Sequence, residues 1–241
     1  MQSKEALVVV DYQNGFIPID EWWTWELAVV WGWLLAPRIN QLMKETKAEW
    51  GLIIGTRDWH PRWHMSFASN YRWKEAFSPV TWDEAMNWIP KKLQLEDTAE
   101  FSVEDIIRET WAGWDQMLWP DHCIAETQSA EYHKDLDTSL IDRHIIKWYD
   151  PTMEMYSWFF GKEDTPEWKL LTEILREFWV KTVRLVWLAT DYCVESSAVD
   201  AVRNWFKAII DSSAVRWVAV KPEDTVEYLR ALREKEGVDY V

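Results

Sequence analysis

The sequence predicts an α/β fold in which a parallel sheet is covered by helices on both faces. Apolar runs of strand length alternate along the chain with segments whose apolar residues recur at helical spacing. Few polar residues interrupt these runs, as expected of strands buried on both faces. With 241 residues, of which 48% are hydrophobic and 28% are charged, the chain can bury a full globular core.

The alternation assigns each element in order. Six apolar segments are predicted as strands: residues 6–13, 51–58, 144–151, 182–190, 207–215 and 237–241. Four segments between them are predicted as helices: residues 34–48, 167–178, 192–206 and 222–235. The first helix places Leu35, Ile39 and Leu42 on one apolar face.

A single domain is expected over residues 1–241, because no internal repeat or low-complexity segment divides the chain. Residues 72–116 depart from the regular alternation, since they are polar and contain tryptophans, with a short helix expected at 103–110. We interpret this stretch as an elaborated excursion between strands of the same domain.

Charge and composition exclude several function classes. A net charge of −15 argues against nucleic acid and against an anionic membrane as partners, because both bind positive surfaces. The longest apolar run, at 27–36, falls short of the roughly 20 residues of a membrane-spanning helix, and no targeting signal is recognisable. Two distant cysteines form no disulfide framework, which favours a reducing, cytoplasmic protein. The sequence leaves a homo-oligomer open.

Polar groups gather where the predicted strands end, which is the edge at which such sheets bind ligands. They are Asp11, Asp58 with His60, Lys147 and the turn from Thr190 to Cys193. Cys193 is predicted at the start of a helix, where the helix dipole would stabilise a thiolate. Asp11 is a candidate base for this nucleophile, and Lys147 would keep both groups ionised. The alternative is an inert, buried cysteine.

A second pattern, Asp58, His60 and His64 in D-x-H-x3-H spacing, offers carboxylate and imidazole ligands for zinc, iron or manganese. His122 adds another imidazole, while the neighbouring Cys123 is expected to be structural. The alternative for these histidines is a set of ordinary hydrogen-bonded surface side chains.

Five motifs stand in a characteristic order: VVVDYQNGF, TRDWHPRWHMSFA, WPDHC, KWYDPTMEMYSWF and LATDYCVESSAVDA. On these motifs the chain resembles the nicotinamidases among the isochorismatase-like cysteine hydrolases, over nearly its whole length apart from much of 72–116. The resemblance implies a six-stranded parallel sheet in an α/β/α sandwich. It also implies conversion of nicotinamide to nicotinate and ammonia through a cysteine thioester.

The resemblance assigns roles to individual residues. Asp11, Lys147 and Cys193 match the catalytic triad of the family. One divalent metal ion, for which zinc is favoured, would be held by Asp58, His60 and His122, with His64 as a fourth candidate, and would bind the pyridine nitrogen. Phe16, Trp119 and Tyr156 match the aromatic positions of the substrate pocket. A cis peptide bond between Leu188 and Ala189 would direct the N–H groups of Ala189 and Cys193 into an oxyanion hole.

The chain departs from the family in one direction, toward tryptophan. It contains 21 tryptophans and only 7 glycines. Tryptophan stands where the family commonly has glycine or another small residue, at positions 148, 158, 187, 205 and 217. Glycine often supplies a positive φ or a close backbone approach, and tryptophan supplies neither without strain. Two other functions remain open. One is a related isochorismatase or other small-amide hydrolase, and the isochorismatases lack these metal ligands. The other, which the tryptophans favour, is a catalytically silent engineered scaffold.

Overall fold

The computed structural model describes residues 4–18, 27–29, 31–72, 74–81, 84, 116–147, 154–218 and 225–241. Seven strands form the main sheet, in the order β6-β5-β2-β1-β7-β8-β9. Their bounds are β1 Lys4–Val10, β2 Leu52–Arg57, β5 Arg143–Ile146, β6 Lys162–Glu163, β7 Val180–Trp187, β8 Lys207–Val215 and β9 Asp239–Tyr240. All neighbouring strands pair in parallel except β6, which runs antiparallel to β5.

The sheet confirms the six predicted strands but corrects the predicted strand number. The additional strand, β6, consists of Lys162 and Glu163 at the edge of the sheet. Two charged residues produce no apolar run, so the pattern that identified the other strands does not register here. The predicted fold class holds, with a mainly parallel sheet that has one antiparallel edge strand.

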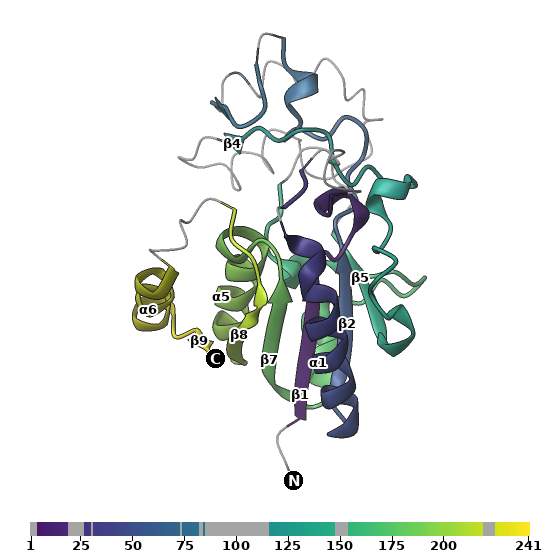
Figure 1. The fold of residues 1–241 in the computed structure, drawn as a ribbon, viewed down its shortest axis with the longest axis vertical. Helices are drawn as coiled ribbons and strands as arrows, with labels where there is room; N and C mark the ends of the chain where they lie inside the picture. The colour runs from purple at the N-terminus through teal and green to yellow at the C-terminus, as the bar shows by residue number, and fades with distance from the viewer. Residues whose placement is uncertain are drawn as a thin grey trace.

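Helices cover both faces of the sheet. They are α1 (Ala36–Ala48), α4 (Leu171–Glu177), α5 (Glu195–Arg203) and α6 (Thr225–Glu236). Alternate residues of β1 enter different layers: Leu7 packs in the cluster that contains Ile39 of α1, whereas Val8 packs in the cluster that contains Ile174 of α4 and Ala198 of α5. Figure 1 shows α1 in front of β1 and β2, with the segment that carries β4 (Gln116–Met117) above the carboxyl ends of the strands.

The 72–116 excursion is described only at its two ends. There β3 (Pro79–Val80) pairs antiparallel with β4 (Gln116–Met117) in a separate small sheet. The short helix expected at 103–110 lies outside the described residues. Among the helices that the structure describes, none is long and apolar enough to cross a membrane.

Three helices are followed by a tryptophan in the left-handed backbone region. Trp50 follows α1 with φ 61°, Trp179 follows α4 with φ 58°, and Trp205 follows α5 with φ 70°. Each N–H donates to a carbonyl three residues earlier, the turn that closes many helices. The fourth helix, α6, is followed by Gly237 with φ 74°, the residue type that adopts this conformation without a Cβ clash. In the part of the chain that the structure describes, the ends of these four α-helices therefore all have the geometry of a glycine cap.

The expectation that tryptophan occupies glycine-type positions is confirmed at two of its five sites. Trp187 and Trp205 have φ values of 89° and 70°. Trp158 and Trp217 are not among the residues with positive φ, so a left-handed backbone does not explain why glycine or another small residue would be preferred at these two positions. Trp148 lies outside the described residues. Further tryptophans with positive φ, which the motifs did not indicate, are Trp31, Trp50, Trp168 and Trp179.

Replacing Trp205 by glycine is expected to raise the free energy of unfolding by about 1 kcal/mol, because the Cβ clash of a left-handed residue disappears. Little packing is lost, since Trp205 is 93% exposed. Trp63→Gly is the matched control, because Trp63 is 51% exposed and lacks a positive φ. Urea unfolding of both variants measures the difference. Equal destabilisation by the two substitutions would contradict the strain argument.

Candidate active site

Three reactive side chains meet at the carboxyl edge of the sheet. Asp11 directly follows β1, Lys147 directly follows β5, and Cys193 lies in the turn after β7. The Lys147 Nζ lies 3.3 Å from the Cys193 Sγ and 3.8 Å from the Asp11 Oδ2. Asp11 and Lys147 are almost completely buried. The parallel sheet therefore brings a base, a cation and a thiol from three distant segments into contact.

Two side chains to which the sequence analysis gave no role in the site orient Asp11. The Thr56 hydroxyl donates to Asp11 Oδ1 at 2.8 Å and accepts the Asp11 N–H at 3.1 Å. The indole N–H of the buried Trp187 donates to the Asp11 carbonyl at 3.0 Å. Thr56 lies in β2, the strand that pairs with β1. Its position two residues before Asp58 is the sequence signal that could have placed it near Asp11.

Burial determines which of these groups carry charge. Burial raises the pKa of Asp11 from 3.8 to about 7, although the Lys147 ammonium opposes this rise. Burial alone would lower the pKa of Lys147, but the electrostatic influence of Asp58, Cys193 and Asp11 outweighs burial and holds that pKa well above its usual value. The site therefore combines a fixed cation with a carboxyl group that can exchange a proton near neutral pH.

The expectation of a thiolate at a helix start is wrong for Cys193 in this structure. The predicted helix over 192–206 begins later, at Glu195, because Thr190–Val194 form a π-helical turn in which the Val194 N–H donates to the Ala189 carbonyl. Burial raises the pKa of the Cys193 thiol above its usual range, and the nearby Lys147 only partly offsets this. The resting group is a neutral thiol that needs a base.

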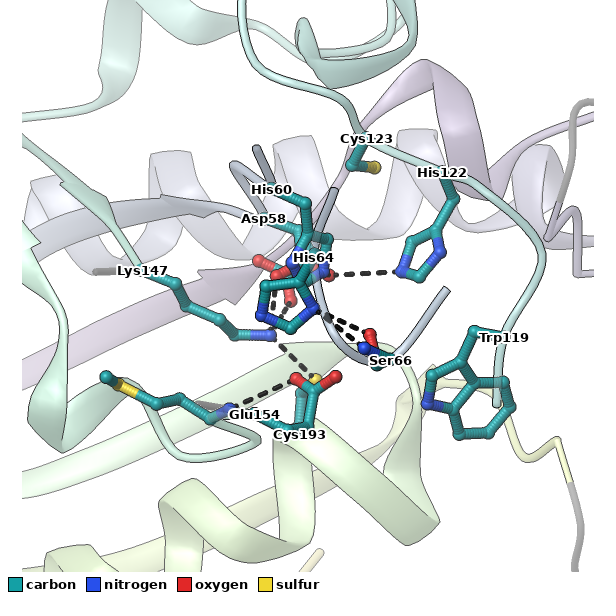
Figure 2. Close-up of polar contacts among 12 residues, drawn as sticks. Asp58, His60, His64, Ser66, Trp119, His122, Cys123, Lys147, Glu154 and Cys193 are labelled. Carbon is teal, nitrogen blue, oxygen red and sulfur yellow. Dashed lines mark hydrogen bonds and ion pairs between the residues drawn. The ribbon is translucent and has the colours of Figure 1, made fainter. Parts of the chain in front are cut away.

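A buried group of one carboxylate and two imidazoles lies beside Lys147. Asp58, His60 and His122 place one ligand atom each within 4.8 Å of one another. The Asp58 Oδ2 is 3.1 Å from the His60 Nε2 and 3.5 Å from the His122 Nε2. The Asp58 Oδ1 is 2.8 Å from the Lys147 Nζ (Figure 2). One carboxylate therefore joins the imidazole pair to the reactive lysine.

The chemistry of this group fits a divalent metal ion such as zinc. The His122 Nδ1 lies 2.7 Å from the Pro120 carbonyl, so it carries the proton and leaves the Nε2 lone pair facing Asp58. Burial lowers the pKa of His60 to about 4, which keeps its imidazole in the neutral form that binds metals. His60 and Lys147 outweigh the effect of burial and hold the pKa of Asp58 well below its usual value.

His64 lies next to this group but outside it. Its ring centroid is 4.3 Å from that of His60, and its Nδ1 is 2.7 Å from the Ser66 hydroxyl. It is not among the residues whose ligand atoms converge within 4.8 Å. A role of His64 as a fourth ligand therefore stays a prediction.

A cavity of about 400 Å³ connects the thiol with the imidazole pair. The three predicted aromatic residues line it, and the Trp119 indole N–H donates to the Tyr156 hydroxyl at 3.3 Å. Phe16 packs against His122 with ring centroids 5.5 Å apart. Tyr192, to which the motifs gave no role, also lines the cavity, and its ring centroid lies 5.2 Å from that of Trp119. Flat aromatic walls between a nucleophile and a candidate metal site suit a ring-shaped ligand.

The expected cis peptide bond is present between Leu188 and Ala189. Both residues line the cavity together with Cys193. The backbone that would form an oxyanion hole thus lies at the same cavity wall as the thiol.

Purified protein is expected to bind one zinc ion per chain. His60→Ala and His122→Ala should each weaken the affinity at least about tenfold, since each removes a converging imidazole. His64→Ala is the matched control and should retain the affinity of the unsubstituted protein. Equilibrium dialysis with metal analysis measures all three variants. Loss of zinc on substitution of His64 alone would contradict the three-residue group.

Known proteins share this fold. The chain matches the isochorismatase domain family over residues 5–235. It is 34% identical to a nicotinamidase of Acinetobacter baylyi, over 81% of this chain and 73% of the relative.

Many solved structures resemble the chain, among them two proteins from an Acinetobacter and a Pyrococcus species. One is a nicotinamidase and pyrazinamidase of Acinetobacter baumanii, with a TM-score of 0.73, 30% identity, and coverage of 99% of this chain and 96% of the other. The second is a zinc complex of a Pyrococcus horikoshii pyrazinamidase, with a TM-score of 0.65, 30% identity, and coverage of 99% and 98%. The chain belongs to the isochorismatase family and is a hydrolase that acts on an amide.

Proposed function

We propose that this chain hydrolyses nicotinamide to nicotinate and ammonia through a thioester on Cys193, with a divalent metal ion held by Asp58, His60 and His122. The observation that carries the proposal is the position of Lys147, whose Nζ lies 3.3 Å from the Cys193 Sγ and 2.8 Å from the Asp58 Oδ1. One ammonium thus links the nucleophile to the candidate metal ligands. Relatives named for nicotinamide and pyrazinamide hydrolysis support the substrate class.

Asp11 activates the nucleophile in this mechanism. Its carboxylate removes the thiol proton of Cys193 as the sulfur attacks the carboxamide carbon. The N–H groups of Ala189 and Cys193 stabilise the negative oxygen that forms. Lys147 stabilises the developing thiolate and positions it, because the ammonium is fixed by Asp58 and Asp11. The protonated Asp11 then gives its proton to the departing amine, which leaves as ammonia.

Asp11 also serves the second half of the reaction. It removes a proton from a water molecule, whose oxygen attacks the thioester carbon. The carbon–sulfur bond breaks, Cys193 regains a proton from Asp11, and nicotinate is released. A carboxyl group whose pKa lies at about 7 can accept and return a proton in each half.

The metal group and the aromatic walls position the ring. A bound divalent ion would supply a Lewis acid for the pyridine nitrogen at the imidazole end of the cavity. Phe16, Trp119 and Tyr156 would hold the ring so that its carboxamide reaches Cys193. One carboxylate and two imidazoles suit zinc, iron and manganese, and zinc is favoured because the similar Pyrococcus horikoshii pyrazinamidase was solved as a zinc complex. This ligand set also favours a nicotinamidase over the metal-free isochorismatase branch.

Ammonia release from nicotinamide tests the proposal directly. Cys193→Ala is expected to lower kcat on the order of 10⁵-fold, because the thioester can no longer form. Cys123→Ala is the matched control and should stay within about tenfold of the unsubstituted enzyme, because the second thiol takes no part in the chemistry. Absence of ammonia from folded, zinc-loaded protein would refute the proposal and favour the silent scaffold.

The pH profile of kcat/KM tests Asp11 as the base. Activity should fall toward acid pH with an apparent pKa no higher than about 7, because protonated Asp11 cannot accept the thiol proton. The Thr56 hydrogen bond lowers the pKa of Asp11, so Thr56→Val should move this limb to higher pH. A limb that stays fixed in Thr56→Val would assign the titration to another group.

A further inference from the structure

A second carboxylate lines the cavity and takes no part in the mechanism above. Glu154 is half-buried and shares the cavity wall with Lys147, Tyr156 and Cys193. Its Oε1 accepts the N–H of Met155 at 3.1 Å, which fixes the head group (Figure 2). His122 lines the same cavity, so Glu154, the thiol and the imidazole pair border one space.

The charges around this cavity are unevenly distributed. Among the described residues that line it, Lys147 is the one permanent cation, whereas Asp11, Asp58 and Glu154 carry carboxyl groups. The ammonium of Lys147 already faces Asp58 at 2.8 Å and Asp11 at 3.8 Å. The field of Glu154 is therefore not neutralised by a partner of its own in the described part of the cavity wall.

The proposed substrate and product differ at one place. Both contain the pyridine ring, so contacts of the ring with the aromatic walls and with a bound metal ion are common to the two. The carboxamide is neutral, whereas the carboxylate that replaces it is an anion formed at Cys193. A fixed carboxylate on the same wall repels the anion and leaves the neutral amide unaffected.

We propose that Glu154 is a specificity-determining residue that selects neutral carboxamides and expels the anionic carboxylate product. This inference rests on the proposed function for the identity of the ring. Among the described residues, Glu154 forms no hydrogen bond or ion pair with Cys193 or with the candidate metal ligands, so it acts on ligand affinity rather than on the chemical step. Ligands with a carboxylate on the ring are the class that it discriminates against.

Binding of two ring ligands that differ in charge tests the inference. Nicotinate and the neutral 3-pyridinemethanol are titrated into zinc-loaded protein, with tryptophan fluorescence as the readout. Glu154→Gln, which keeps the shape and removes the charge, should tighten nicotinate binding about tenfold and change 3-pyridinemethanol binding less than about twofold. Glu154→Asp should retain the weak nicotinate binding. Glu167→Gln, the same change at an exposed site outside the cavity, should leave both affinities unchanged.

Equal changes for the two ligands in Glu154→Gln, or an unchanged affinity for nicotinate, would overturn the inference. The titration needs no turnover, so its result is separate from that of the ammonia assay. If the unsubstituted chain releases no ammonia but Glu154→Gln selectively tightens nicotinate binding, the proposed reaction is refuted and the selection against carboxylates by Glu154 is supported. If the unsubstituted chain releases ammonia but Glu154→Gln does not selectively tighten nicotinate binding, the proposed reaction is supported and the role of Glu154 is refuted.

Discussion

The buried ammonium of Lys147 is the interaction on which the rest of the site depends. It contacts the thiol of Cys193 and the carboxylates of Asp11 and Asp58, three groups from separate segments of the chain. A buried cation is costly unless such partners compensate it, and buried carboxylates have the same need. The proposed nucleophile, its proposed base and the candidate metal ligands are consequently one electrostatic unit. Loss of Lys147 would leave two carboxylates facing each other without a counter-charge.

Much of this arrangement could be predicted from the sequence, because parallel strands end at a common edge. Asp11 and Lys147 follow apolar runs directly, so the rule for α/β sheets places them together. The protonation of Cys193 could not be predicted, since it depends on burial and on a π-helical turn that no spacing rule indicates. Glu154 lies within the motif KWYDPTMEMYSWF, but the resemblance gave it no role and no spacing rule singles it out.

The tryptophans show a different limit of sequence reasoning. Comparison with family motifs identified Trp187 and Trp205 as glycine-type positions, and their backbone angles agree. Trp50 and Trp179 lie beyond helix ends outside any motif, so only the φ values reveal them. Local sequence and local backbone disagree at these places, whereas in most proteins the two are consistent. The family fold persists because the strain falls largely at the surface, as at Trp205, which is 93% exposed.

The helix ends also have a consequence for the gene. A codon that one genetic code reads as tryptophan and another reads as glycine would place tryptophan at the positions where the backbone requires glycine. Tryptophans that serve as ordinary aromatic residues, such as Trp119 in the cavity wall, would be written with the standard codon. The backbone angle would then sort the tryptophan codons of this gene into two classes, and Trp50, Trp179 and Trp205 would fall in the same class.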